Sequence, residues 1–196
     1  MFTAKVLYDE ARETLRRPRE SAGRVLQWPI PQAAIWPLVA LSITLSTLVT
    51  ELSAAMNPPE PGAAVVYIPP FALAGILGIM NVGMAWGIAT IGRTFGGVGT
   101  FYPTLILMTW QQFVWFAVLL ILTLLGSVVP AIAGLLSMAF GIWMIWVLIN
   151  FASTLHGIQI GRAALVVILA SIIAATAMVF MLGFFGVSFG GAVPNG

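Results

Sequence analysis

Long stretches without a single charged residue dominate this sequence of 196 residues. Uncharged runs of 26, 32, 68 and 34 residues follow Arg24, Glu60, Arg93 and Arg162 in turn. Only 7% of the chain is charged, against about 25% in an average soluble domain. A helix that crosses a bilayer needs about 20 mostly apolar residues. The sequence therefore predicts an all-α, polytopic transmembrane helical bundle of one domain, and it excludes secreted, nucleic-acid-binding and disordered classes.

Connectors rich in proline and glycine divide the apolar runs, because clusters of these residues end helices. The connectors read MNPPEPGA, RTFGGVGT, GSVVP and LHGIQIGR. We predict five spans, at residues 33–54, 71–92, 103–125, 132–154 and 163–184. The expected organisation is a cytosolic segment over residues 1–28, a five-span domain over 29–185 and a glycine-rich tail over 186–196.

Positive charge predicts the orientation of the spans. Five spans place all eight Lys and Arg on one side: six in the N-terminal segment, with Arg93 and Arg162 in the two connectors on that side. Glu51 and Glu60 fall on the opposite side. Because cytoplasmic loops carry the excess of Lys and Arg, we expect a cytoplasmic N-terminus and a C-terminus outside.

The N-terminal segment has the pattern of an amphipathic helix. Leu7, Ala11 and Leu15 recur every four residues between charged residues, and Pro18 ends the helix. A second short piece over residues 21–28 leads into the membrane. Such a helix beside a bilayer is expected in the interface plane, with its apolar side toward the lipid. Two roles remain open: a topology anchor, or a docking face for a cytosolic partner.

Residues for catalysis or metal binding are scarce. The tail contains a G-x-S-x-G pattern around Ser188, but the single histidine, His156, is predicted on the other side of the membrane. About 30 Å of hydrocarbon separates the two sides, so the imidazole cannot act as the base for this serine. The chain has no cysteine, and one histidine cannot form a metal site. We therefore expect no enzyme activity, no cofactor and no metal.

Polar residues at membrane depth are the remaining functional pointers. The candidates are Glu51, Asn81, Gln111, Gln112 and Asn150. The four amides could form hydrogen bonds between helices, or they could line a solute path. Convergence on one cavity would favour transport, whereas dispersal among separate helix contacts would favour a scaffold.

Two further patterns concern packing. Trp28, Trp36 and Trp110 lie near predicted span ends and are expected in interfacial belts, whereas the deeper Trp86, Trp115, Trp143 and Trp146 are expected to fill gaps between helices. The Gly83-xxx-Gly87 pattern predicts close helix packing, either inside the bundle or in a homo-oligomer.

Several short motifs, in this order, resemble the Yip-domain family of Ypt/Rab-interacting membrane proteins in its short bacterial form. Leu15-Arg16-Arg17-Pro18-Arg19 precedes the first span, Gly96-Gly97-Val98-Gly99-Thr100-Phe101 leads into the third, and Leu155-His156-Gly157 precedes Arg162-Ala163. The resemblance implies a five-helix protein without established catalytic activity, here in a bacterial cytoplasmic (inner) membrane. Eukaryotic relatives bind Rab-type GTPases, but this chain lacks their Asp-Leu-Tyr-Gly-Pro signature, which argues against GTPase binding.

The sequence thus predicts a non-enzymatic membrane scaffold or adaptor, or a protein that affects lipid organisation. The alternative is a small-solute or lipid transport protein with a path lined by the buried amides. Expected partners are membrane lipids, a second copy or another membrane protein, and no nucleic acid. The candidate partner or lipid contacts are Arg16, Arg17, Arg19, Arg93, Gly96, Gly97, Gly99, His156 and Arg162.

Overall fold

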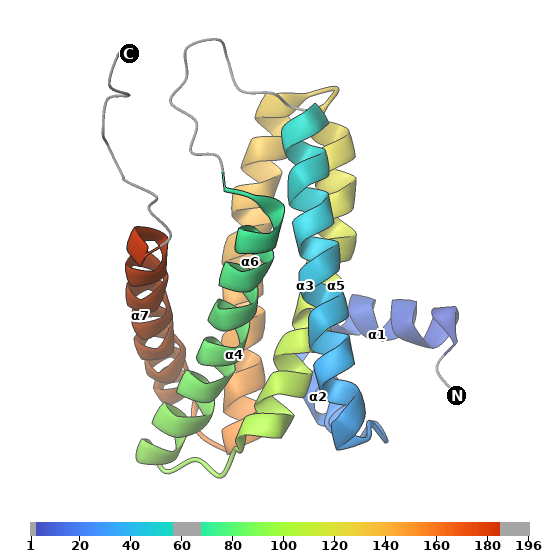
Figure 1. The fold of residues 1–196 in the computed structure, drawn as a ribbon. Coiled ribbons are helices and arrows are strands. Elements are labelled where there is room, and N and C mark those ends of the chain that lie inside the picture. The colour runs from blue at the N-terminus through green and yellow to red at the C-terminus, as the bar shows by residue number, and fades with distance from the viewer. Residues whose placement is uncertain (1–2, 57–67, 185–196) are drawn as a thin grey trace.

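The computed structural model describes residues 3–56 and 68–184, and these residues are helical with short connectors. The helices are α1 (Ala4–Arg16), α2 (Pro18–Val25), α3 (Gln32–Met56), α4 (Pro70–Thr94), α5 (Phe101–Gly126), α6 (Pro130–His156) and α7 (Ile160–Phe184) (Figure 1). The last five are long and apolar enough to cross a membrane. The described part of the chain is therefore an all-helical integral membrane protein with five candidate spans.

Prolines and a glycine set several helix ends. Pro18, Pro70 and Pro130 occupy the first position of α2, α4 and α6, where the missing N–H would have no helical partner in any case. Gly157 ends α6 with φ of +65°, a conformation that glycine adopts without strain. Each span agrees with its predicted range to within three residues, so the prediction of five spans is confirmed.

The spans form one bundle in which α5 packs against α3 and α6, and α7 packs along α4 and α6. Gly87 allows α4 and α7 to approach closely, because a Cβ at this position would lie 3.2 Å from the Cβ of Ala170. Gly83, the other half of the predicted pair, has open space around it. The close packing predicted for this motif therefore occurs inside the bundle, at Gly87.

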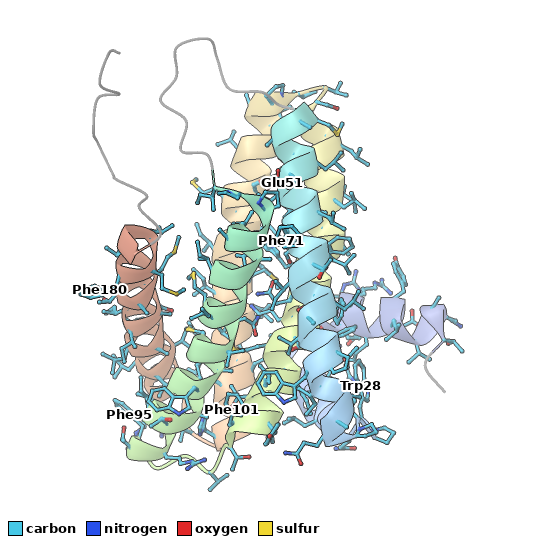
Figure 2. The ribbon with its side chains drawn as sticks, viewed as in Figure 1. Trp28, Glu51, Phe71, Phe95, Phe101 and Phe180 are labelled. Atoms are coloured by element: carbon cyan, nitrogen blue, oxygen red, sulfur yellow. The ribbon has the colours of Figure 1, made fainter. Side chains whose placement is uncertain are left out.

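The outer surface of the spans is apolar. Phe71 on α4 and Phe180 on α7 are 94% and 75% exposed, and Figure 2 shows Phe180 pointing away from the bundle. Large apolar surfaces of this kind are rare on soluble monomers. The exposed faces of α4 and α7 therefore match lipid tails rather than water.

The N-terminal helices pack beside the spans. Helix α2 lies along α6, and α1 runs sideways from the bundle, well away from both of its ends (Figure 1). Near the end of α1, the carbonyl of Leu15 accepts a hydrogen bond of 3.1 Å from the indole of Trp143, the middle residue of α6. Thr14 contacts Trp110, about 14 Å from the start of α5 at 1.5 Å per residue. Helix α1 thus lies within the length of the spans.

The two connectors that carry Arg93 and Arg162 lie at the same end of the bundle. The N–H of Val98 in one connector donates to the carbonyl of His156 at the start of the other, over 3.2 Å. This end also holds the start of α3, whereas α3 finishes at the opposite end, toward which α7 also runs (Figure 1). That the connector end is cytoplasmic stays a prediction from charge. Glu60 and the 186–196 tail, with Ser188, lie outside the described residues.

Candidate functional site: the docked N-terminal helices and the His156 connector

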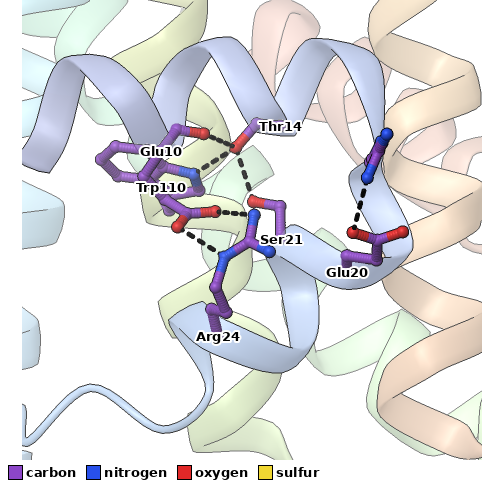
Figure 3. Close-up of polar contacts among 7 residues, drawn as sticks. Glu10, Thr14, Glu20, Ser21, Arg24 and Trp110 are labelled. Atoms are coloured by element: carbon purple, nitrogen blue, oxygen red, sulfur yellow. Dashed lines mark hydrogen bonds and ion pairs between the residues drawn. The ribbon is translucent and has the colours of Figure 1, made fainter.

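A buried hydroxyl joins α1, α2 and α5 (Figure 3). The Thr14 hydroxyl donates to the carbonyl of Glu10 at 2.8 Å and lies 2.7 Å from the hydroxyl of Ser21. The indole N–H of Trp110 donates to the same Thr14 oxygen at 2.8 Å. Thr14 and Ser21 are fully buried. Because a buried polar group without a partner costs about 1–3 kcal/mol, this network favours one position of α1 on the bundle.

An ion pair adds a second link between α1 and α2. Arg24 donates from Nε and Nη2 to the two carboxylate oxygens of Glu10, at 2.8 and 3.0 Å. This hydrogen bonding to Glu10 raises the pKa of Arg24 above its ordinary value. Trp28 packs edge-on against Trp110, with ring centroids 5.0 Å apart. The two helices and the start of the first span therefore form one unit with α5.

Arg19 connects α2 to α6. Its Nε donates to the side-chain oxygen of Asn150 at 3.1 Å, and its Nη2 donates to the hydroxyl of Ser153 at 3.3 Å. Asn150 also donates to the carbonyl of Trp146 at 2.8 Å. An amide predicted inside the membrane is thus a partner of an arginine from the N-terminal segment.

The tryptophan predictions are wrong at several positions. Trp110 was expected in an interfacial belt, but it is buried because Thr14 and Trp28 cover its indole. Trp86 and Trp146 were expected to fill gaps between helices, yet they are exposed on the outer surface. Trp143 is also partly exposed, although its indole contacts α1 at Leu15. The depth of a residue along a span can be estimated from sequence, but the side of the helix that faces a neighbour depends on tertiary packing.

His156 is the centre of the connector end. Its Nδ1 accepts a hydrogen bond of 3.1 Å from the N–H of Gly99, so Nδ1 carries no proton in this geometry and the ring is neutral. A Cβ at Gly92, Gly97 or Gly99 would come within 3.0 Å of His156 atoms. The glycines are therefore needed for the 93–100 connector to close around the imidazole, which is 1% exposed.

The other candidate contacts surround this connector or lie on the N-terminal helices. Arg93 donates from Nε to the carbonyl of Gly99 at 3.3 Å, and Gly96 has φ of +86°, which favours glycine. Arg16 and Arg162 are exposed, and Arg17 forms an exposed pair with Glu20 at 3.6 Å. His156 shapes the connector from inside, while the arginine side chains reach the surface.

The polar residues predicted at membrane depth do not gather at one place. Gln111 donates to the carbonyl of Met144 at 2.9 Å, and Asn150 contacts Arg19 as described above. Asn81 is buried with no hydrogen-bond partner among the described residues. Gln112 is half-buried, and half-buried Glu51 lies toward the far end of α3 from Trp28 (Figure 2).

Two hollows open on the apolar surface. The first, of about 760 Å³, lies between α1, α3 and α5, and the second, of about 710 Å³, lies between α3 and α4. None of the four amides lines either hollow. Within residues 3–56 and 68–184, no three His, Asp or Glu side chains come together as metal ligands would.

Sequence reasoning missed the interactions that fix α1. Thr14, Ser21 and the pair of Glu10 with Arg24 were not singled out, because charged and hydroxyl side chains near a helix terminus are usually solvated. A weak signal was present: Glu10 and Thr14 are one turn apart, beside the apolar stripe that contains Leu7 and Leu15. Only their partners, Arg24 on α2 for Glu10 and Trp110 on α5 for Thr14, distinguish them from ordinary surface residues.

Comparison with known protein families identifies a match over most of the chain. The family model of the Yip1 domain matches residues 12–183, from the second half of α1 to the last turn of α7. No curated protein and no solved structure matches the chain significantly. The match includes all five candidate spans together with α2 and the second half of α1.

Proposed function

This chain belongs to the Yip1 family of membrane proteins, and from this premise we propose that it is a non-enzymatic scaffold that organises the bilayer around itself. The family consists in general of non-enzymatic membrane proteins of trafficking. The single observation that carries the proposal is the position of α1, a charged helix held beside the middle of the spans.

The charges of α1 require a polar environment. Lys5, Asp9, Arg12 and Arg16 are all exposed. One such charge at the centre of a bilayer costs about 2.5–3.5 kcal/mol on insertion scales, and four would cost roughly four times as much. Lipid headgroups and water therefore reach α1 on this side of the bundle.

The remaining apolar length on this side is short. From Trp110, at the level of α1, to Gly126 at the end of α5 is about 24 Å at 1.5 Å per residue. A typical hydrocarbon core is about 30 Å thick. On the other side of the bundle, the part of α7 that follows Arg162 carries no charged residue up to Gly183 and is about 30 Å long. The protein would thus thin the bilayer by about 6 Å beside α1 and not beside α7, at a cost of a fraction of a kcal/mol per Å.

The dispersal of the amides supports a scaffold over a transport protein. Gln111 and Asn150 form separate contacts between helices, and neither lines a hollow. A scaffold also needs a contact surface. We propose that the exposed arginines of the N-terminal helices, together with the connector enclosing His156, provide it on the cytoplasmic side.

Spin-label depth measurements test whether the bilayer is thinner beside α1 than beside α7, a difference termed the thickness step. Because the chain has no cysteine, single labels can be attached to introduced cysteines. Asp9→Cys places a label on α1, and Leu165→Cys places one on the exposed face of α7, about 8 Å from its start. Leu165 is therefore closer to the connector end than α1 is. Ile172→Cys, exposed near the middle of α7, is the hydrocarbon control. Each variant is reconstituted in nanodiscs, and collisions with oxygen and with a water-soluble nickel complex are compared.

The proposal expects nickel access at position 9 and oxygen-rich hydrocarbon at positions 165 and 172. If positions 9 and 165 are both accessible to nickel, the bilayer begins at the level of α1 all around the protein, and there is no step. If the label at position 9 reports hydrocarbon, α1 is embedded and the charge argument is wrong.

A further inference from the structure

The hollow between α1, α3 and α5, here termed the groove, has the shape of a site for a long apolar ligand. One wall is the apolar face of α1 with Leu7, Ala11 and Leu15, and the other extends along α5 from Ile106 to Ile121. That wall is about 22 Å long at 1.5 Å per residue. The volume of about 760 Å³ falls within the range of about 300–1,000 Å³ typical of small-molecule sites.

The lining of this groove is almost entirely hydrocarbon. Its middle is formed by aromatic and aliphatic side chains, including Trp28, Phe113 and Val118. Water gains few hydrogen bonds in such a space, and an empty groove loses van der Waals contacts. The groove also faces the region that lipid tails fill around α3 and α5, so a lipid tail is the occupant that its surroundings supply.

Positive charge lies at the edge of the groove. Arg12 is itself a lining residue, and Lys5 and Arg16 lie near it on the same edge of α1, because residues four or seven apart share a helix face. None of the three forms a salt bridge with a described residue. Asp9 lies between these cations and Glu13 lies three residues before Arg16, so the edge has three cations against two acids and keeps a net positive charge.

We propose that this groove binds one acyl chain of an anionic phospholipid from the leaflet on the α1 side, with the headgroup phosphate at Arg12. The tail lies along α5 toward Ile121, against the apolar stripe of α1. The cations of the edge favour anionic over zwitterionic headgroups by charge. The proposal rests on the interfacial placement of α1 in the proposed function, and it adds a ligand and its site.

Photo-crosslinking of the full chain in detergent micelles tests the site. The probes are phosphatidylglycerol and phosphatidylcholine, each with one diazirine in the middle of the same acyl chain. Cross-linked positions are identified by peptide mass spectrometry. A micelle has no bilayer whose thickness could change. Absence of cross-linking in micelles would therefore count against the lipid site alone, whereas the nanodisc measurements test the difference in bilayer thickness.

Ala117→Phe blocks the groove, because Ala117 is exposed on its wall and the larger ring enters open space. Ile172→Phe, on the exposed face of α7, is the matched control. We expect cross-links on the α5 segment from Ile106 to Ile121 to fall at least fivefold in Ala117→Phe and to stay unchanged in Ile172→Phe. Cross-links spread evenly over α3 and α7, or insensitive to Ala117→Phe, would overturn the site.

A charge variant tests headgroup recognition. Arg12→Gln should lower the ratio of phosphatidylglycerol to phosphatidylcholine cross-links about fivefold, the factor that corresponds to about 1 kcal/mol per basic residue. Arg17→Gln, which removes an exposed cation that does not line the groove, should leave the ratio unchanged. Equal labelling by both lipids in the unmodified protein would overturn the anionic assignment.

Discussion

Because glycines pack against His156, we predict that replacing glycine by alanine destabilises the protein at one position of α4 and not at another. Gly92 and Gly83 both lie in α4. At Gly83 an added Cβ has nothing within 4 Å, whereas at Gly92 its three nearest neighbours are all imidazole atoms of His156, each closer than 3.0 Å. The same substitution therefore has opposite expected effects at two positions of one helix.

The magnitudes follow from two terms. Alanine is favoured over glycine in a helix interior by about 0.5–1 kcal/mol, so Gly83→Ala should be neutral or stabilising. Overpacking a filled site costs about 1–3 kcal/mol. Gly92→Ala should therefore lower the free energy of unfolding by about 0.5–2 kcal/mol, because the helix gain offsets only part of the clash.

The His156→Ala variant is the background in which the effect of Gly92→Ala should change. It removes every atom that the Gly92 Cβ would meet, while it also deprives the Gly99 N–H of its acceptor. In this background Gly92→Ala should become neutral or favourable, although the background itself is less stable. The coupling energy of the double-mutant cycle should be about 1–3 kcal/mol, within the range seen for residues in contact.

The assay is equilibrium unfolding in mixed micelles with increasing SDS, followed by far-UV circular dichroism. Gly83→Ala controls for helix propensity and for any general effect of alanine in α4. The packing argument is refuted if Gly92→Ala is as well tolerated as Gly83→Ala, or if its cost persists unchanged in His156→Ala.

Three further predictions concern the N-terminal helices and the connectors. Thr14→Val should lower the free energy of unfolding in SDS by about 2–3 kcal/mol, because the Trp110 indole loses its buried acceptor. Thr14→Ser keeps the hydroxyl and should recover most of this loss. Arg19→Gln should cost more than Arg17→Gln in the same SDS unfolding assay, since the Arg17 pair is exposed and worth at most about 1 kcal/mol. Single cysteines in the two connectors that enclose His156 should react with an impermeant maleimide from the same side of a sealed vesicle. A cysteine in the α5–α6 turn should react from the other side. Labelling of all three positions from one side would contradict the arrangement of the spans.

The five spans follow directly from the sequence. The cost of leaving apolar residues in water, or of placing charged ones in lipid, depends mainly on local composition, so uncharged runs such as the one between Arg93 and Arg162 identify membrane segments. Prolines and glycines such as Pro130 and Gly157 then set helix ends through their own backbone preferences. The apolar stripe of α1 and the grouping of Arg93 with Arg162 are likewise properties of order along the chain.

Only the tertiary structure decides which of these residues meet. Thr14 and Trp110 are 96 residues apart, and Gly99 and His156 are 57 apart. A buried hydrogen bond needs a specific partner at a specific distance and angle, and hydrophobic periodicity does not encode that partner. For the same reason the sequence indicates that α1 is amphipathic but does not give its height beside α6. The packing of α2 and the hydroxyl of Thr14 set that height, and with it the groove and the short apolar length beside α5.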